Sequence, residues 1–144
     1  MENLDWRSNI DEIITAYKRD GAVIIRNAIP PELIVKAALA VEQMASTDYN
    51  GSMKAGELSN DKEGRFFSLM FPYNENPAIA EFLSQSDLPE IAAKIMESNQ
   101  VRYFFNHLLI KNAKTNSATP WHQDRPYWPV TGKQILGIWI PFDY

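Results

Sequence analysis

The segment TPWHQDRPYWPV, residues 119–130, holds a histidine, an acidic residue two positions later and three aromatic residues. In an extended strand, residues two apart point to the same face, so the side chains of His122 and Asp124 can reach one point while Gln123 faces away. An imidazole nitrogen and a carboxylate oxygen are ligands of non-haem Fe(II), which commonly has two histidines and one carboxylate on one face. The segment therefore predicts two of three iron ligands. The alternative is a hydrogen-bonded His–Asp pair without a metal.

The composition is that of an ordinary globular protein. The chain has 144 residues, 45% of them hydrophobic, and four tryptophans, so it can bury one hydrophobic core. The formal net charge is -4 and no cluster of Lys or Arg occurs, so we do not expect nucleic acid as a partner. The lack of cysteine excludes a disulfide framework, a thiolate zinc site and a cysteine nucleophile, and it fits a reducing compartment.

Two further patterns bear on location. The N-terminal residues 1–13 have neither the basic region nor the apolar region of a secretory signal. No apolar run is long enough to span a bilayer. We therefore predict a cytoplasmic protein without a membrane partner.

The first half of the chain predicts two helices around a strand. Apolar residues at helical spacing predict an amphipathic helix from Ile10 that ends at Gly21. The segment GAVIIRNAI, residues 21–29, is rich in β-branched residues and lies between glycine and a proline pair, so it predicts a buried strand. Residues 31–45 predict a helix that packs on a sheet. Its apolar face would carry Leu33, Ala37, Val41 and Met44.

The rest of the chain predicts a long loop, two more helices and two strands. Residues 46–64 are polar and rich in glycine, which is typical of a loop. Residues 65–71 fit either a strand or a buried helical turn. The further expected elements are helices at 77–85 and 88–98, a strand at 101–111 covered on both faces, and an apolar strand at 134–143. Helices first and strands later favour an α+β fold or a barrel with an N-terminal helical layer.

The sequence around His122 resembles the phytanoyl-CoA dioxygenase family of Fe(II)- and 2-oxoglutarate-dependent oxygenases. The resemblance is carried by WHQDRPYWP followed by WIPFD, and HLLIK and GAVIIRNAI with PPEL look similar to the family as well. It covers almost the whole chain and is most specific from 103 to 143. The matching residues are Pro120, Trp121, His122, Gln123, Asp124, Pro126, Tyr127, Trp128, Pro129, Trp139 and Asp143.

The resemblance implies an α+β or mainly β fold, a double-stranded β-helix (jelly roll, cupin-like) with an N-terminal helical layer. One domain would span 1–144, with a helix-rich layer and one strand in 1–100 and the first barrel strands in 101–144. The family has a second iron histidine and a 2-oxoglutarate-binding arginine further along. Residues 125–144 contain no histidine and no arginine except Arg125, so we expect this chain to be an N-terminal part of such a domain. Domains of this kind have ~200–250 residues.

The resemblance also implies roles for individual residues. His122 and Asp124 would bind Fe(II), and the 2-oxoglutarate pocket would include His107, Lys111 and Trp139. Each pocket residue has an alternative. His107 could be a core histidine with a backbone partner, and we do not expect it to be the second iron histidine. Lys111 could be a solvated residue at a strand end, and Trp139 could pack in the core on one face with Ile135, Gly137 and Pro141.

Three residues after the motif are candidates for the substrate side. Tyr127 and Trp128 could shape the substrate entrance, or they could pack in a turn around the neighbouring prolines. Arg125 could meet an anionic substrate, or it could be an exposed loop residue without a role.

The resemblance implies a hydroxylase, because halogenating relatives carry a small residue where this chain has Asp124. The expected reaction hydroxylates a small organic substrate with O2 and releases succinate and CO2 from 2-oxoglutarate. The first alternative is a non-catalytic half-barrel that serves as a binding or assembly module, with an exposed apolar sheet edge buried in an oligomer. A second alternative is a metal-dependent isomerase or hydrolase on a related barrel.

Overall fold

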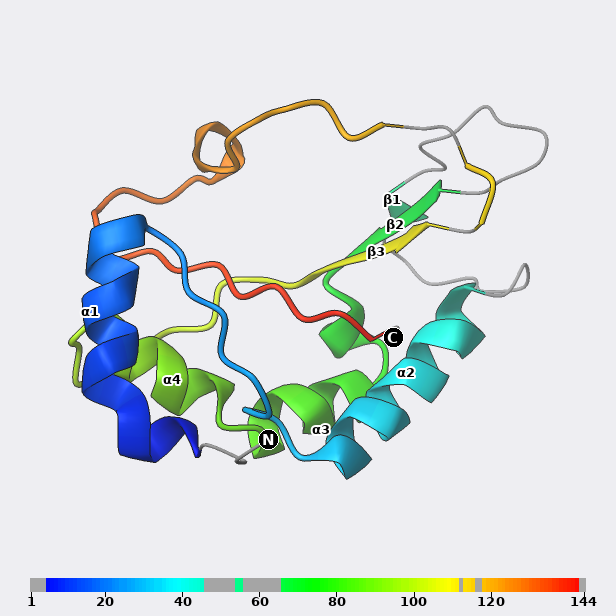
Figure 1. The fold of residues 1–144 in the computed structure, drawn as a ribbon. Coiled ribbons are helices and arrows are strands. Elements are labelled where there is room, and N and C mark those ends of the chain that lie inside the picture. Colours follow the sequence, from blue (N-terminus) through cyan, green and yellow to red (C-terminus); the bar gives the residue numbers. More distant parts are fainter. Residues whose placement is uncertain (1–4, 46–53, 56–65, 112, 116–117, 143–144) are drawn as a thin grey trace.

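The computed structural model describes residues 5–45, 54–55, 66–111, 113–115 and 118–142. It contains helices and one small antiparallel sheet, shown in Figure 1. The elements are η1 (Trp6–Asn9), α1 (Ile10–Asp20), α2 (Pro31–Ala45), β1 (Lys54–Ala55), β2 (Phe66–Met70), η2 (Pro72–Asn74), α3 (Pro77–Gln85), α4 (Leu88–Ile95), β3 (His107–Lys111) and η3 (Arg125–Tyr127). The α+β expectation is confirmed in this form, and the described ranges do not show a jelly-roll barrel. None of the helices in these ranges is both long enough and apolar enough to cross a membrane.

The sheet has the order β1–β2–β3, and β2 pairs antiparallel with both neighbours. In the β2–β3 pair, Met70 lies opposite His107 and Phe66 lies opposite Lys111. Since side chains alternate along a strand, this register gives the sheet two distinct faces. The inner face consists of Phe67, Leu69, Leu108 and Ile110, which pack in the hydrophobic core. The outer face consists of Phe66, Ser68, Met70, His107, Leu109 and Lys111.

Helices α2 and α3 cover the inner face of the sheet (Figure 1). The predicted apolar face of α2 is confirmed, because Ala37 and Met44 are buried and Leu33 and Val41 pack against the same cluster. The central residue is Leu69 of β2, which is 0% exposed. The main core thus lies on one side of the sheet and leaves the outer face for other contacts.

A second cluster joins the N-terminus to α4. Trp6 is 5% exposed and packs with Ile91 and Ile95 of α4. The Trp6 indole N–H donates a hydrogen bond to Asp87 Oδ2 at 3.3 Å, and Arg7 forms an ion pair with Asp87 Oδ1 at 2.9 Å. These contacts hold η1 and α1 against the start of α4.

The predicted end of the first helix at Gly21 is confirmed. Gly21 has a left-handed backbone with φ 76°, and its N–H donates to the carbonyl of Tyr17 at 2.8 Å. Residues with a Cβ atom adopt this conformation only at an energetic cost, whereas glycine adopts it without that cost.

Replacing Gly21 with alanine is therefore expected to lower the free energy of unfolding by about 1–2 kcal/mol, the cost of a left-handed backbone for a residue with a Cβ. No atom lies within 4 Å of a Cβ built at Gly21 or at Gly137, so neither substitution meets a steric clash. Gly137→Ala is the matched control, and urea unfolding measures both variants. Equal effects of the two substitutions would contradict the conformational explanation.

The contribution of the Asp87 contacts to the stability of the fold is expected to fall at acidic pH. The Arg7 guanidinium lowers the pKa of Asp87 below its ordinary value of 3.8, burial opposes this shift, and the Trp6 N–H adds to it. Because the folded pKa is the lower one, the contribution of Asp87 is present above its ordinary pKa and is lost as the pH falls through the folded value. Asp87→Asn should flatten this dependence in melting curves near pH 6 and near pH 3, on either side of a carboxyl pKa of about 4. Glu42→Gln on α2 should leave it unchanged, and an unchanged slope in Asp87→Asn would disprove the account.

The strand prediction for residues 21–29 is wrong. Residues 22–25 are extended but pair with no strand of the described part. Val23 and Ile25 pack on the second cluster, whereas Ile24 is 79% exposed. The β-branched pattern therefore reflects an extended segment with one packed side, not a hydrogen-bonded ladder.

The strand prediction for residues 134–143 is also wrong within the described residues, which end at 142. This segment is extended without ladder pairing. Leu136 packs on the second cluster, and Ile140 and Phe142 pack on the main core. Trp139 is 80% exposed, so the alternative that it packs in the core with Ile135, Gly137 and Pro141 is wrong. Leu136, Ile140 and Phe142 therefore carry the apolar contacts of this segment, whereas Ile138 is 45% exposed.

Other boundaries differ by smaller amounts. The predicted strand at 101–111 is reduced to β3, and its residues are exposed or half-buried instead of covered on both faces. The helix at 88–98 ends at Ile95, followed by Glu97 with a left-handed φ of 49°. The undecided segment 65–71 contains β2. The predicted loop 46–64 lies outside the described residues except for Lys54–Ala55, which forms β1. The helix at 77–85 is confirmed as α3.

Candidate metal centre

The His–Asp motif lies on a segment that passes on the other side of the sheet from α2 and α3 (Figure 1). Residues 118–123 are not in a strand, and Asp124 has a helical backbone with φ -71° and ψ -31° at the start of η3. The expected strand geometry is therefore wrong. His122 and Asp124 nevertheless meet, because the turn that begins at Asp124 brings the carboxylate back toward the imidazole.

The ring orientation of His122 is fixed by its own backbone. Its Nδ1 lies 2.7 Å from the carbonyl oxygen of Pro120. A carbonyl can only accept a hydrogen bond, so Nδ1 must carry the proton. In the neutral ring this leaves a lone pair on Nε2, and Nε2 lies 3.2 Å from Asp124 Oδ1. A histidine nitrogen anchored by a carbonyl on its other side is the usual arrangement of a metal-binding histidine.

The separation of the two atoms fits a shared cation. With a neutral ring, both Nε2 and Oδ1 are acceptors and cannot hydrogen-bond to each other. A metal ion can join them, or a second proton on the ring, which turns it into an imidazolium. Two ligand atoms about 2.1 Å from one metal and at right angles to each other lie about 3.0 Å apart. The observed 3.2 Å between His122 and Asp124 is close to that spacing. Their side chains are 46% and 63% exposed, so an ion can reach them from solvent.

The described part of the chain brings two possible metal-binding side chains together at this point. No group of three or more His, Cys, Asp or Glu side chains that could hold a metal occurs in these ranges. A nitrogen and a carboxylate oxygen are two of the three ligands in a facial site for Fe(II). The residues present therefore fit part of an iron site.

His107 lies on the outer face of the sheet, and its partner is a side chain. Ser68 Oγ lies 2.7 Å from His107 Nε2, and Ser68 is 2% exposed. The expectation of a backbone partner is thus wrong. Burial lowers the pKa of His107, and the negative charge of Asp124 partly opposes this shift. His107 and the His122–Asp124 pair therefore share one electrostatic environment.

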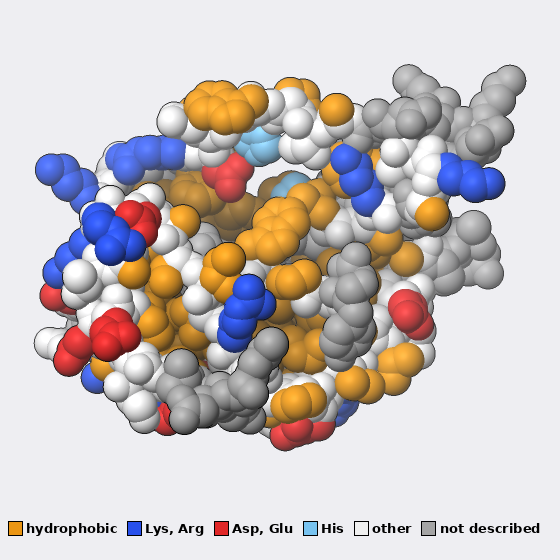
Figure 2. All heavy atoms as spheres, in the orientation of Figure 1, with side chains coloured by type: hydrophobic (Ala, Val, Ile, Leu, Met, Phe, Trp, Pro, Cys, Tyr) orange, Lys and Arg blue, Asp and Glu red, His pale blue; other side chains and the backbone are white. Residues whose placement is uncertain are grey.

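Figure 2 shows the surface of the molecule around the histidine side chains. Pale-blue histidine side chains and a red acidic side chain lie at a hollow on this face, and orange hydrophobic side chains cover much of its floor. A mostly apolar hollow with a few polar groups at its edge is the common form of a small-molecule site.

The other two predicted cosubstrate residues lie at exposed positions. Lys111 is exposed on the outer face, with its Nζ 4.9 Å from the centre of the Phe66 ring. A cation above an aromatic ring is a stabilising contact, so Lys111 is not simply solvated. Trp139 is 80% exposed. Their binding of 2-oxoglutarate stays a prediction.

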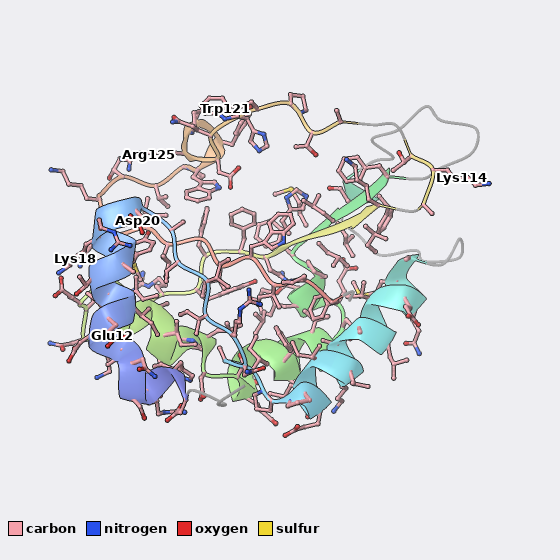
Figure 3. All side chains as sticks on the ribbon, in the orientation of Figure 1. Glu12, Lys18, Asp20, Lys114, Trp121 and Arg125 are labelled. Carbon is pink, nitrogen blue, oxygen red and sulfur yellow. The ribbon has the colours of Figure 1, made fainter. Side chains whose placement is uncertain are left out.

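The three predicted substrate-side residues differ in their surroundings. Arg125 is exposed in η3, and Figure 3 shows it with Trp121 on the segment that crosses above the sheet. Tyr127 is 78% exposed. Trp128 is half-buried and packs edge-on against Phe104 and Phe105. Only Trp128 of the three is thus fixed by aromatic contacts in the structure as described.

Three residues near the site were not predicted. Ser68 holds His107, and Phe104 and Phe105 hold Trp128. A signal was present for Ser68, because it is the one polar uncharged side chain between apolar residues in FFSLMF. No local pattern marks the two phenylalanines, because their partner is more than twenty residues away in the sequence.

The model of the family described as phytanoyl-CoA dioxygenase matches residues 17–144. The chain belongs to the phytanoyl-CoA dioxygenase family. This is a family of Fe(II)- and 2-oxoglutarate-dependent oxygenases, so the predicted family is confirmed. No curated protein and no solved structure matched the chain. Within this family member, the His122–Asp124 pair is the part of the structure that fits the iron chemistry.

Proposed function

We propose that this phytanoyl-CoA dioxygenase family member hydroxylates a small organic substrate, with His122 and Asp124 as two of its Fe(II) ligands. The supporting observation is the 3.2 Å separation of His122 Nε2 and Asp124 Oδ1, together with the hydrogen bond of His122 Nδ1 to Pro120. The match to an Fe(II)- and 2-oxoglutarate-dependent family supports the choice of metal and cosubstrate.

The reaction consumes 2-oxoglutarate, O2 and a C–H bond. One oxygen atom enters succinate as CO2 leaves, and the other enters the substrate as a hydroxyl group. When bound, iron supplies the activation of O2. The carboxylate of Asp124 leaves no room for a halide ligand, which favours hydroxylation over halogenation.

The residues of the protein would position the iron ligands and orient 2-oxoglutarate. The Pro120 carbonyl holds the His122 ring so that Nε2 and Asp124 face one point. His107, oriented by Ser68, and the cation of Lys111 lie on the same sheet face, where they would meet the 2-oxoglutarate carboxylates. Trp139 stays a candidate for the 2-oxoglutarate pocket, and Arg125, Tyr127 and Trp128 stay candidates for the substrate side. A jelly roll, a cytoplasmic location and a homo-oligomer likewise stay predictions.

Succinate formation tests the proposal. The protein is incubated with Fe(II), ascorbate, 2-oxoglutarate and O2, and succinate is measured by mass spectrometry with and without a chelator. We expect succinate that depends on iron and on 2-oxoglutarate, since uncoupled turnover needs no knowledge of the substrate. Iron binding without any succinate would disprove the dioxygenase proposal and would favour the non-catalytic binding or assembly module.

A further inference from the structure

Four aromatic rings form a continuous cluster near the His–Asp pair. The Trp128 ring centre lies 6.4 Å from that of Phe104 and 6.2 Å from that of Phe105, in edge-on contacts. The Phe104 and Phe105 centres are 5.0 Å apart, and Phe71 lies 5.8 Å from Phe105. We name the four rings, Phe71, Phe104, Phe105 and Trp128, the aromatic wall.

The chain connects this wall to the candidate site at two points. The N–H of Tyr127 donates to the Asp124 carbonyl at 2.9 Å, so a tight turn separates the Asp124 carboxylate from Trp128. On the other side, Phe105 precedes His107 by two residues in the sequence. Three of the four rings, Phe104, Phe105 and Trp128, thus lie within four residues of His107 or Asp124, and Phe71 directly follows β2.

One ring of the aromatic wall, that of Phe104, is partly exposed to solvent. Phe104 is 44% exposed although its ring contacts both Phe105 and Trp128. The exposed part of the ring is available for contact with another apolar group, whose binding would remove this area from water. A ring fixed by two neighbours and open on the remaining side can receive another aromatic ring at low entropic cost.

We propose that the aromatic wall selects the substrate, and that the substrate presents an aromatic ring to Phe104. The inference rests on the proposed function, since it assigns a substrate class to the same site. A ring is favoured over an alkyl chain because edge-to-face contacts add attraction beyond the burial of area. The wall carries no charged side chain, so the part of the substrate that contacts it is uncharged. Phe104 and Trp128 are therefore specificity-determining residues.

Ring binding can be measured without turnover. The probes are phenylacetate and cyclohexylacetate, which have the same length and charge and differ in the ring. Saturation-transfer NMR with the metal-free protein gives the affinity of each. We expect phenylacetate to bind about two- to tenfold more tightly than cyclohexylacetate, the range of one edge-to-face pair. Equal binding of the two probes would overturn the proposal.

A conservative variant tests whether Phe104 is the residue that prefers an aromatic ring. Phe104→Leu keeps an apolar side chain at a partly exposed position, so the fold should survive, and it should remove the preference for phenylacetate. Trp121→Leu is the matched control, because Trp121 is an aromatic residue next to His122 that is 90% exposed. The preference should persist in Trp121→Leu. A preference retained in Phe104→Leu, or lost equally in Trp121→Leu, would contradict the assignment.

The failure of this inference is distinguishable from the failure of the proposed function. His122→Ala removes a proposed iron ligand and leaves the aromatic wall in place. If it keeps the phenylacetate preference, the wall acts independently of iron, as the inference requires. If wild-type protein forms succinate but shows no ring preference, the dioxygenase proposal stands and the substrate class is wrong.

Discussion

Replacing His122 with alanine is expected to weaken Fe(II) binding by more than about 100-fold. Outer partners that only orient a metal ligand contribute about 10- to 100-fold to metal affinity, so removing the ligand atom itself costs more. The described residues bring His122 Nε2 to 3.2 Å from Asp124 Oδ1, and no group of three or more possible metal-binding side chains occurs among them. With either removed, a single exposed side chain remains.

Anaerobic titration calorimetry with Fe(II) measures this effect. Asp124→Ala should reproduce the loss, and Gln123→Ala, at the exposed position between the two ligands, should bind iron like the wild type. Circular dichroism confirms that each variant is folded. An Fe(II) affinity unchanged in His122→Ala would show that the pair is an ordinary hydrogen-bonded His–Asp pair and would remove the basis of the proposed function.

Leu69→Ala is expected to lower the free energy of unfolding by about 2–5 kcal/mol, the range for a leucine truncated in a close-packed core. Leu69 is 0% exposed at the centre of the sheet and packs in the main core with Met44 of α2 and Phe82 of α3. The missing methyl groups would leave a cavity between two helices and a strand that are held by many other contacts. The surroundings can therefore collapse only in part.

Leu109→Ala is the matched control for this prediction. Leu109 is half-buried on the outer face of the neighbouring strand, so the same chemical change removes less buried area there. Urea unfolding at constant slope should give a distinctly smaller loss for Leu109→Ala. Equal losses in the two variants would mean that the inner face is not the main core.

The helices of this protein could be predicted from the sequence because their signals are local. The 3.6-residue spacing places Ala37, Val41 and Met44 on one face, and Gly21 supplies the one backbone conformation that ends α1. Both signals lie within a few neighbouring residues. The structure therefore agrees with the predicted helices to within three residues at each boundary.

Strands were harder to predict because a strand is defined by its partner. Val23 and Ile25 look like strand residues, but the ladder forms at Phe66–Met70, whose sequence fitted two interpretations. Pairing depends on which backbone lies alongside, and that information is spread over the chain. The same reason explains Trp139, where the choice of packed face depended on helices distant in sequence.

One part of the candidate site could be predicted from a local motif, and another part depends on residues distant in the sequence. The spacing of His122 and Asp124 predicted that their side chains meet, although a turn and not a strand brings them together. The Ser68–His107 contact and the aromatic wall depend on β2–β3 register and on the path of the segment after β3, which no short motif encodes.

The four tryptophans differ widely in solvent exposure, and this has a spectroscopic consequence. Trp6 is 5% exposed and hydrogen-bonded to Asp87, Trp128 is half-buried, and Trp139 and Trp121 are 80% and 90% exposed. Indole emission shifts to longer wavelength in water, and collisional quenchers reach only exposed rings. Acrylamide should therefore extinguish the red part of the emission first, leaving a blue component from Trp6 that reports on the junction of η1 with α4. The intrinsic fluorescence of the protein thus separates events at the N-terminal junction from events near the His122–Asp124 pair without any added label.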